Sequence, residues 1–198
     1  MTTIPFTFQI DSQNGRPTYF ENHLERNLSA MGGQFLDTDT YQQMVAGGDP
    51  VLYEVYEISR PQVAGELIHG TSILRPGKVG NEYFMTKGHF HTVLDTAEIY
   101  VCQQGQGAMV METPEGEWSI EELTPGKILY VPPRWAHRSV NTGDIDLITF
   151  FAYPGNAGHD YGTIETQGFR KLIVEKDGQP DYIDNPRWQA PKQRAGLR

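Results

Sequence analysis

Cysteine is almost absent from this sequence, because Cys102 is the single one among 198 residues. One cysteine excludes an intrachain disulfide and any zinc site built from cysteines. Long apolar runs are absent too, since no segment approaches the roughly 20 residues that a membrane-spanning helix requires. The opening residues, MTTIPFTFQI, lack the basic region and small-residue cleavage site of a secretory signal. We therefore expect a cytoplasmic protein that does not enter a membrane.

Basic side chains are scarce: 16 lysines and arginines stand against 25 aspartates and glutamates, a formal net charge of −9. A protein that wraps nucleic acid or adheres to anionic lipid needs the opposite balance. Nucleic acid and membrane are therefore not expected as partners. The length and the 38% share of hydrophobic residues are those of a chain that folds around one sizeable core.

Glycine and proline are plentiful, at 21 and 13 residues, and they punctuate the whole chain as turn signals. Between the turns lie short segments rich in β-branched and aromatic residues. This pattern is typical of an all-β sandwich or barrel. We expect strands at Val51–Glu57, Glu66–Leu74, Ala97–Gln103, Ala108–Thr113, Trp118–Leu123, Lys127–Val131, Ile145–Tyr153 and Lys171–Glu175.

One domain is expected to span residues 1–198, with its core at about 50–175. Residues 1–49 form a less regular N-terminal extension packed on the barrel, and residues 187–198 form a polar C-terminal tail.

Within the extension we expect a short helix at Thr38–Ala46. Thr38 or Asp39 is expected to cap its start, and Gly47-Gly48 is expected to end it.

The residues best suited to chemistry surround His89 and His91. In a strand, a spacing of two places both imidazoles on one face, and imidazoles suit borderline transition metals. Glu98 follows in an alternating run that puts it on the same face as Tyr100. An inward carboxylate is costly unless a cation or hydrogen bonds satisfy it. His137 offers a third imidazole, and together these side chains predict a metal site with open coordination positions.

The residues alone also allow a second interpretation. His89 and His91 can be polar surface groups of a strand, and a neighbouring arginine can satisfy Glu98.

The spacing resembles the two sequence signatures of the cupin superfamily. The first consists of His89, His91, Glu98 and Gly105, and the second of Gly126, Pro132, His137 and Asn141. There are two departures. Six residues separate His91 from Glu98, where most cupins have three or four, and Arg134 stands where a glycine is expected. Neither departure removes a ligand.

Longer strings resemble the cupin-type, or archaeal-type, glucose-6-phosphate isomerases. They are DPVLYEVY (49–56), EYFMTKGHFH (82–91), AEIYV (97–101), YVPPRWAHR (130–138), AGHDYGTI (157–164) and DNPRW (184–188). The resemblance implies a double-stranded β-helix, or jelly-roll, barrel. It also implies a metal-dependent isomerase of glycolysis and gluconeogenesis that interconverts D-glucose 6-phosphate and D-fructose 6-phosphate.

By the same resemblance, the metal ligands are His89, His91, Glu98 and His137. They would hold one divalent ion per subunit, usually Fe²⁺ with Mn²⁺ or Zn²⁺ as substitutes, in a homodimer. The substrate contacts are Tyr53, Ser72, Thr86, the Gly88 backbone, Tyr100, Tyr153, His159 and Tyr161. The catalytic group comprises Glu98, His89, His137 and Tyr100. Two routes stay open: an enediol route in which Glu98 removes the C2 proton, and a hydride shift between the two carbons.

Two other functions stay open as well. The same ligands would suit another metal-dependent cupin, such as a dioxygenase acting on a small organic acid, and cupins also serve as non-catalytic sugar-binding modules. Outside the site, Arg138 is expected at the surface or an interface, and His23 and His69 are expected to be structural.

Overall fold

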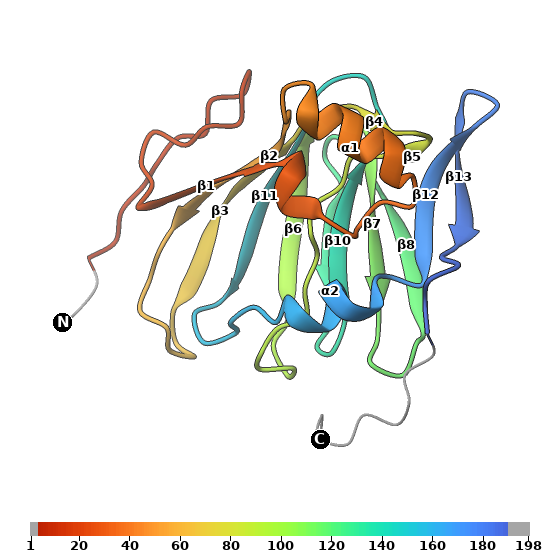
Figure 1. Ribbon diagram of the computed structural model, residues 1–198. Coiled ribbons are helices and arrows are strands. Elements are labelled where there is room, and N and C mark those ends of the chain that lie inside the picture. The colour runs from red at the N-terminus through yellow and green to blue at the C-terminus, as the bar shows by residue number, and fades with distance from the viewer. Residues whose placement is uncertain (1–3, 190–198) are drawn as a thin grey trace.

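A computed structural model describes residues 4–189, and its sheets are antiparallel throughout (Figure 1). The largest sheet has six strands in the spatial order β1-β2-β3-β11-β6-β9. Their bounds are β1 Asn22–Asn27, β2 Val51–Ile58, β3 Leu67–Leu74, β11 Leu147–Pro154, β6 Glu98–Gln104 and β9 Ile128–Val131.

Two smaller sheets complete the β-structure. One has the order β10-β7-β8, with bounds Ala136–Asn141, Gly107–Glu112 and Trp118–Leu123, and the other has the order β13-β12-β5-β4, with bounds Gln179–Asp184, Lys171–Lys176, Glu82–Tyr83 and Lys78–Val79. One buried apolar cluster joins the sheets and includes Leu52 from β2, Met109 from β7 and Ile173 from β12. The all-β fold expected from the sequence is therefore confirmed, and the core lies between the sheets.

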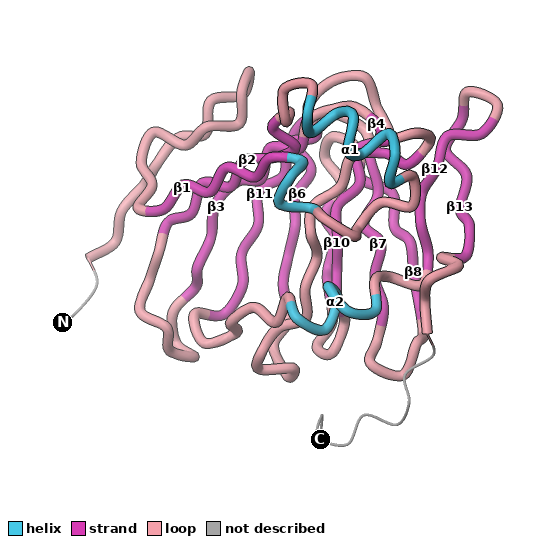
Figure 2. The backbone as a smooth tube through the Cα atoms, viewed as in Figure 1, coloured by secondary structure: helices cyan, strands magenta, loops and turns pink. Residues whose placement is uncertain are grey.

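The helices lie outside the strands, with α1 (Thr38–Ala46) and α2 (Gly162–Gln167) toward opposite ends (Figure 2). A 3₁₀ turn, η1, spans Leu28–Met31. The predicted bounds of α1 are confirmed, but its cap is Asp37 rather than Thr38 or Asp39, because the Asp37 carboxylate accepts the Thr40 N–H at 2.9 Å. No helix within residues 4–189 is long and apolar enough to cross a membrane.

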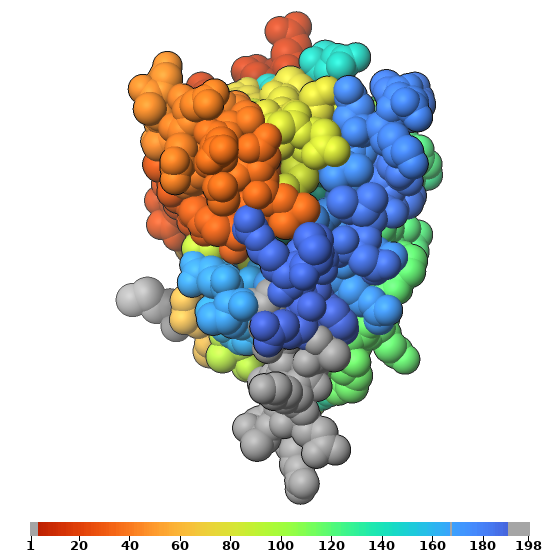
Figure 3. All heavy atoms as spheres, turned by 45° about the vertical axis from the view of Figure 1, so that its right-hand side comes forward, coloured from red at the N-terminus to blue at the C-terminus, as the bar shows by residue number. Residues whose placement is uncertain are grey.

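The N-terminal extension is more regular than its sequence suggests. Its strand β1 pairs along its length with β2 and forms one edge of the six-stranded sheet. The extension also meets the C-terminal part of the chain (Figure 3). Arg187 donates hydrogen bonds to the carbonyls of Phe35 and Leu36, both at 3.0 Å. The division into extension, core and tail stays a prediction, and residues 1–3 and 190–198 lie outside the described part.

Candidate metal centre and substrate cavity

Three imidazoles and one carboxylate meet inside the barrel, and we call His89, His91, Glu98 and His137 the His–Glu cluster. Glu98 is the first residue of β6, and His137 is the second of β10. His89 and His91 lie in the connection between β5 and β6. This connection is not the strand expected from the sequence, since its pairing is limited to isolated bridges such as His89 with His137. The bridge brings these two histidines together.

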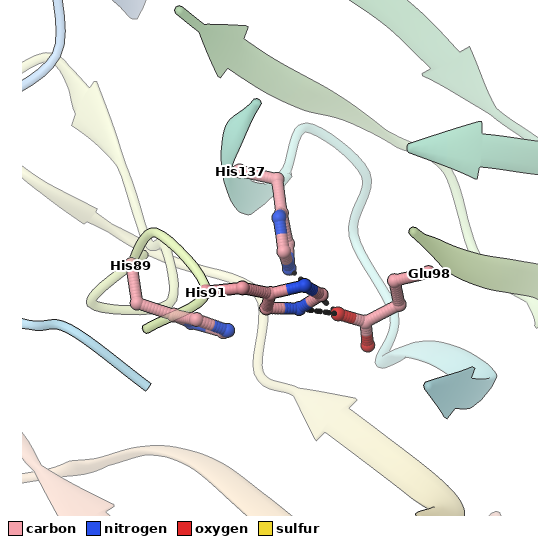
Figure 4. A group of neighbouring side chains, drawn as sticks. All are labelled: His89, His91, Glu98 and His137. Carbon is pink, nitrogen blue, oxygen red and sulfur yellow. Dashed lines mark hydrogen bonds and ion pairs between the residues drawn. The ribbon is translucent and has the colours of Figure 1, made fainter. Parts of the chain in front are cut away.

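The four side chains point at one spot (Figure 4). One ligand atom from each lies within 4.8 Å of the others. Glu98 Oε2 is 3.1 Å from His91 Nε2 and 2.9 Å from His137 Nε2. The predicted grouping of these residues is therefore observed, although their sequence positions are 48 residues apart at the extremes (137 − 89).

The Nδ1 atoms of His91 and His137, which face away from the centre of the cluster, contact oxygen atoms of nearby residues. His91 Nδ1 lies 3.1 Å from the Thr96 carbonyl and 2.8 Å from its hydroxyl, and His137 Nδ1 lies 3.3 Å from the Trp135 carbonyl. Such contacts orient imidazoles for ligation through Nε2. Within residues 4–189, the buried Nε2 atom of His89 has no hydrogen-bond partner, and the only close polar contact of the buried His137 Nε2 is the one with Glu98. Buried polar atoms are nearly always satisfied, so this donor set fits a metal ion.

Electrostatics favour the ligating forms of two members. Burial, and then the neighbouring His137, hold the pKa of His89 well below its usual value. Burial alone would raise the pKa of Glu98, but His137 and His91 keep it far below the usual range. A neutral His89 and an ionised Glu98 are the forms that bind a divalent cation.

We expect the metal-free protein to lose stability as the pH falls from about 7 to about 4. Both pKa values are depressed on folding, so the unfolded chain binds each proton first. Stability linked to His89 is therefore lost as pH falls below 6.5, and that linked to Glu98 is lost below 4.5. Thermal midpoints of chelator-treated protein check this. His89→Ala should remove the loss of stability that begins below pH 6.5. A thermal midpoint of the chelator-treated wild type that does not change with pH would contradict the expectation.

Beside the cluster lies a cavity of about 260 Å³, which we call the polar cavity. His89, Glu98 and His137 line it. So do all eight residues predicted to contact substrate: Tyr53, Ser72, Thr86, Gly88, Tyr100, Tyr153, His159 and Tyr161. The structure thus brings the predicted contacts together, while their individual roles stay predictions.

The tyrosine hydroxyls of the polar cavity are protonated donors. Burial and the Glu98 carboxylate raise the pKa of Tyr100, and burial together with Glu57 raises that of Tyr153. Burial likewise raises the pKa values of Tyr53 and Tyr161. Uncharged hydroxyls can donate hydrogen bonds to an anionic ligand.

Part of the cavity wall was missed by sequence reasoning. Asn22, His23 and Leu24 of β1 line it, and so does Glu57, which accepts the Tyr153 hydroxyl at 3.0 Å. The strand period could have found Glu57, because it shares a face of β2 with Tyr53. His23 is thus a wall residue as well as a structural one, whereas His69 lies outside the cavity.

The turn at Gly88 packs against Arg138, which was expected from the sequence to lie at the surface or an interface. Arg138 is buried, not at the surface, because β10 is covered on both faces. Its guanidinium donates to the Lys87 carbonyl at 2.6 Å and stacks 4.7 Å from the Phe169 ring centroid. Gly88 lies beside Arg138 and has a positive φ of 75°. A left-handed turn supported by Arg138 therefore brings the Gly88 backbone to the polar cavity.

We expect Gly88→Ala to lower the thermal midpoint and raise KM. An added Cβ would stand 2.6 Å from the Phe169 ring and 3.0 Å from Arg138 Cβ, so the turn must shift. The positive φ adds strain of about 1 kcal/mol or more. Gly178→Ala is the matched control, because its φ is 77° but nothing lies within 4 Å. Equal loss in both variants would show that the packing under Gly88 is unimportant.

Fold and cluster together define an all-β protein whose grouped side chains suit a metal ion beside a small-molecule cavity. A family model described as glucose-6-phosphate isomerase (GPI) matches residues 25–189. The glucose-6-phosphate isomerase of Thermococcus litoralis is 49% identical over 187 residues, 93% of this chain and 97% of that protein. The enzyme of the same name from Pyrococcus horikoshii is 50% identical over 166 residues, 84% of this chain and 88% of that protein. A solved oxalate oxidase shares 14% identity over 61% of this chain and 60% of that one, with a TM-score of 0.47. The chain belongs to the glucose-6-phosphate isomerase family.

Proposed function

We propose that this protein interconverts D-glucose 6-phosphate and D-fructose 6-phosphate. The observation that carries the proposal is the junction of the His–Glu cluster with the polar cavity, where one wall offers metal ligands and the others offer hydroxyls. Two relatives that match most of this chain bear the name of that isomerase.

The cavity residues hold the two ends of the sugar phosphate. Ser72, Thr86 and the Gly88 backbone supply hydrogen-bond donors for the phosphate, and Tyr53 and Tyr161 add phenol hydroxyls. Fixing the remote phosphate positions the reacting carbons, which lowers the entropic part of the barrier. Tyr153 and His159 line the same cavity, which supports a role for both in contacting the sugar.

The His–Glu cluster holds the divalent ion, which we propose to be Fe²⁺, with Mn²⁺ or Zn²⁺ as substitutes. When bound, such an ion polarises the carbonyl of the open-chain sugar. Glu98 and Tyr100 lie one strand repeat apart on β6 and both line the cavity, which supports roles for both beside the carbons that exchange hydrogen. Deuterium uptake from solvent at C2 during turnover separates proton removal by Glu98 from a direct hydride shift.

The decisive experiment is a coupled fructose-6-phosphate to glucose-6-phosphate assay on chelator-stripped protein. Activity should vanish on stripping and return when one divalent ion per chain is added back. Oxygen consumption on a small organic acid without any isomerisation would instead make the protein another kind of metal-dependent cupin.

We also propose that the protein is a cytoplasmic homodimer. Support for the dimer comes from the outer face of the six-stranded sheet. There Ile99 of β6 pairs in register with Tyr130 of β9, and Ile128 lies two residues away. These apolar side chains are 38%, 60% and 66% exposed, respectively. Grouped exposed apolar residues often mark a protein interface. Light scattering tests the dimer.

A further inference from the structure

The polar cavity poses a charge problem for a phosphate ester. Among the described residues that line it there is no lysine or arginine, while Glu57 and Glu98 add two carboxylates. The whole chain carries a net charge of −9. Hydrogen bonds from neutral hydroxyls do not offset the charge of a dianionic phosphate, whereas a guanidinium supplies positive charge as well as donors. A cation close to the cavity wall would therefore strengthen phosphate binding.

Two nearby cations are already occupied. Lys87 is ion-paired with Glu165 of α2. Arg138 donates to the Gln34 side chain at 2.5 Å and to the Lys87 carbonyl at 2.6 Å. Both cations therefore have partners within the protein.

Arg26 differs from both. It lies on β1 opposite Tyr53 in the register, and it shares strand parity with Asn22 and Leu24, which line the cavity. Its guanidinium carbon is 5.7 Å from the Tyr53 ring centroid and 5.9 Å from that of Tyr161. Its Nε is buried with no hydrogen-bond partner. Within residues 4–189 no ion pair involves Arg26.

We propose that Arg26 of β1 is the cationic ligand of the substrate phosphate. It would bind the phosphate at the end of the polar cavity where Tyr53 and Tyr161 lie. This inference rests on the proposed function. A guanidinium can stack its face on aromatic rings while the donors at its edge bind a phosphate. The two tyrosines thus orient Arg26, and Arg26 supplies the charge that the hydroxyls lack.

The test compares Arg26→Met with Arg26→Lys. Losing one charge-assisted contact should raise KM for fructose 6-phosphate roughly 10- to 100-fold, with a similar rise in the inhibition constant of inorganic phosphate. The kcat and the metal content should stay near wild type. Arg26→Lys keeps the charge and should recover part of both losses. Arg16→Met is the matched control, since Arg16 also stacks on a tyrosine, 5.7 Å from the Tyr56 centroid, but lies outside the cavity.

Three results would overturn the assignment. They are an unchanged KM in Arg26→Met, a raised KM with unchanged inhibition by inorganic phosphate, and equal losses in the Met and Lys variants. Calorimetric titration of wild type and Arg26→Met with inorganic phosphate keeps the test separate from the reaction. If wild type does not isomerise, the proposed function fails, and weaker phosphate binding by the variant still supports the role of Arg26. Thermal unfolding of each variant confirms that it is folded.

Discussion

His89→Ala is expected to abolish isomerisation and to lower the bound metal well below one ion per chain. His89 carries a buried Nε2 with no protein partner, so its place in the cluster is toward the ion. Metal catalysis contributes several kcal/mol, and each 1.4 kcal/mol is tenfold in rate. The loss in kcat/KM should thus be about three orders of magnitude or more. Elemental analysis and the coupled assay measure the two effects.

His69→Ala is the matched control for this change. The His69 ring also packs against aromatic side chains, 6.2 Å from the Phe6 ring centroid, and its Nδ1 is 2.9 Å from the Leu67 carbonyl, but it lies outside the cluster. Its metal content and turnover should match wild type. Full turnover of His89→Ala after chelation would end the case for a catalytic metal.

Glu98→Gln is expected to lower kcat/KM by more than about 100-fold. The substitution keeps the shape of the side chain but removes the charge that stands within hydrogen-bond distance of His91 and His137. An amide binds a divalent cation more weakly than a carboxylate does, and it takes no proton from carbon. Metal titration and steady-state kinetics separate the two causes, because a metal defect is rescued by excess ion and a proton-transfer defect is not.

Glu54→Gln controls for the loss of a buried charge. Glu54 is as buried as Glu98, each being 3% exposed, but it contacts Arg16, Arg75 and Tyr56 outside the cluster. This variant should lose stability and keep its metal. Equal metal loss in both variants would show that burial of charge, not ligation, explains the Glu98 effect.

The His–Glu cluster was predictable because ligand chemistry constrains residue type and spacing. His89, His91, Glu98 and His137 are chemically distinctive residues at short intervals within two segments. The alternation from Glu98 through Cys102 also matched the structure, where the even-numbered positions are buried. The register between the two segments was not visible in the sequence, because it depends on long-range pairing such as that of His89 with His137.

Strand β1 was missed for a physical reason. Its sequence, NHLERN, has little apolar alternation, and its strand character comes from pairing with β2 rather than from local propensity. The cavity wall formed by Asn22 and Leu24 therefore escaped detection, and so did Arg26 on the same strand. Arg138 was misplaced because strand parity shows only which face a side chain takes. It does not show whether another layer covers that face.

The position of β1 at the rim of the six-stranded sheet has an evolutionary consequence. This strand pairs with a single neighbouring strand, β2, while all four residues of the His–Glu cluster lie elsewhere. Mutations in β1 can therefore alter which molecule is admitted without disturbing the reactive centre. Because β1 and the His–Glu cluster are separate in this way, related chains could change the molecule they bind while keeping the same reaction.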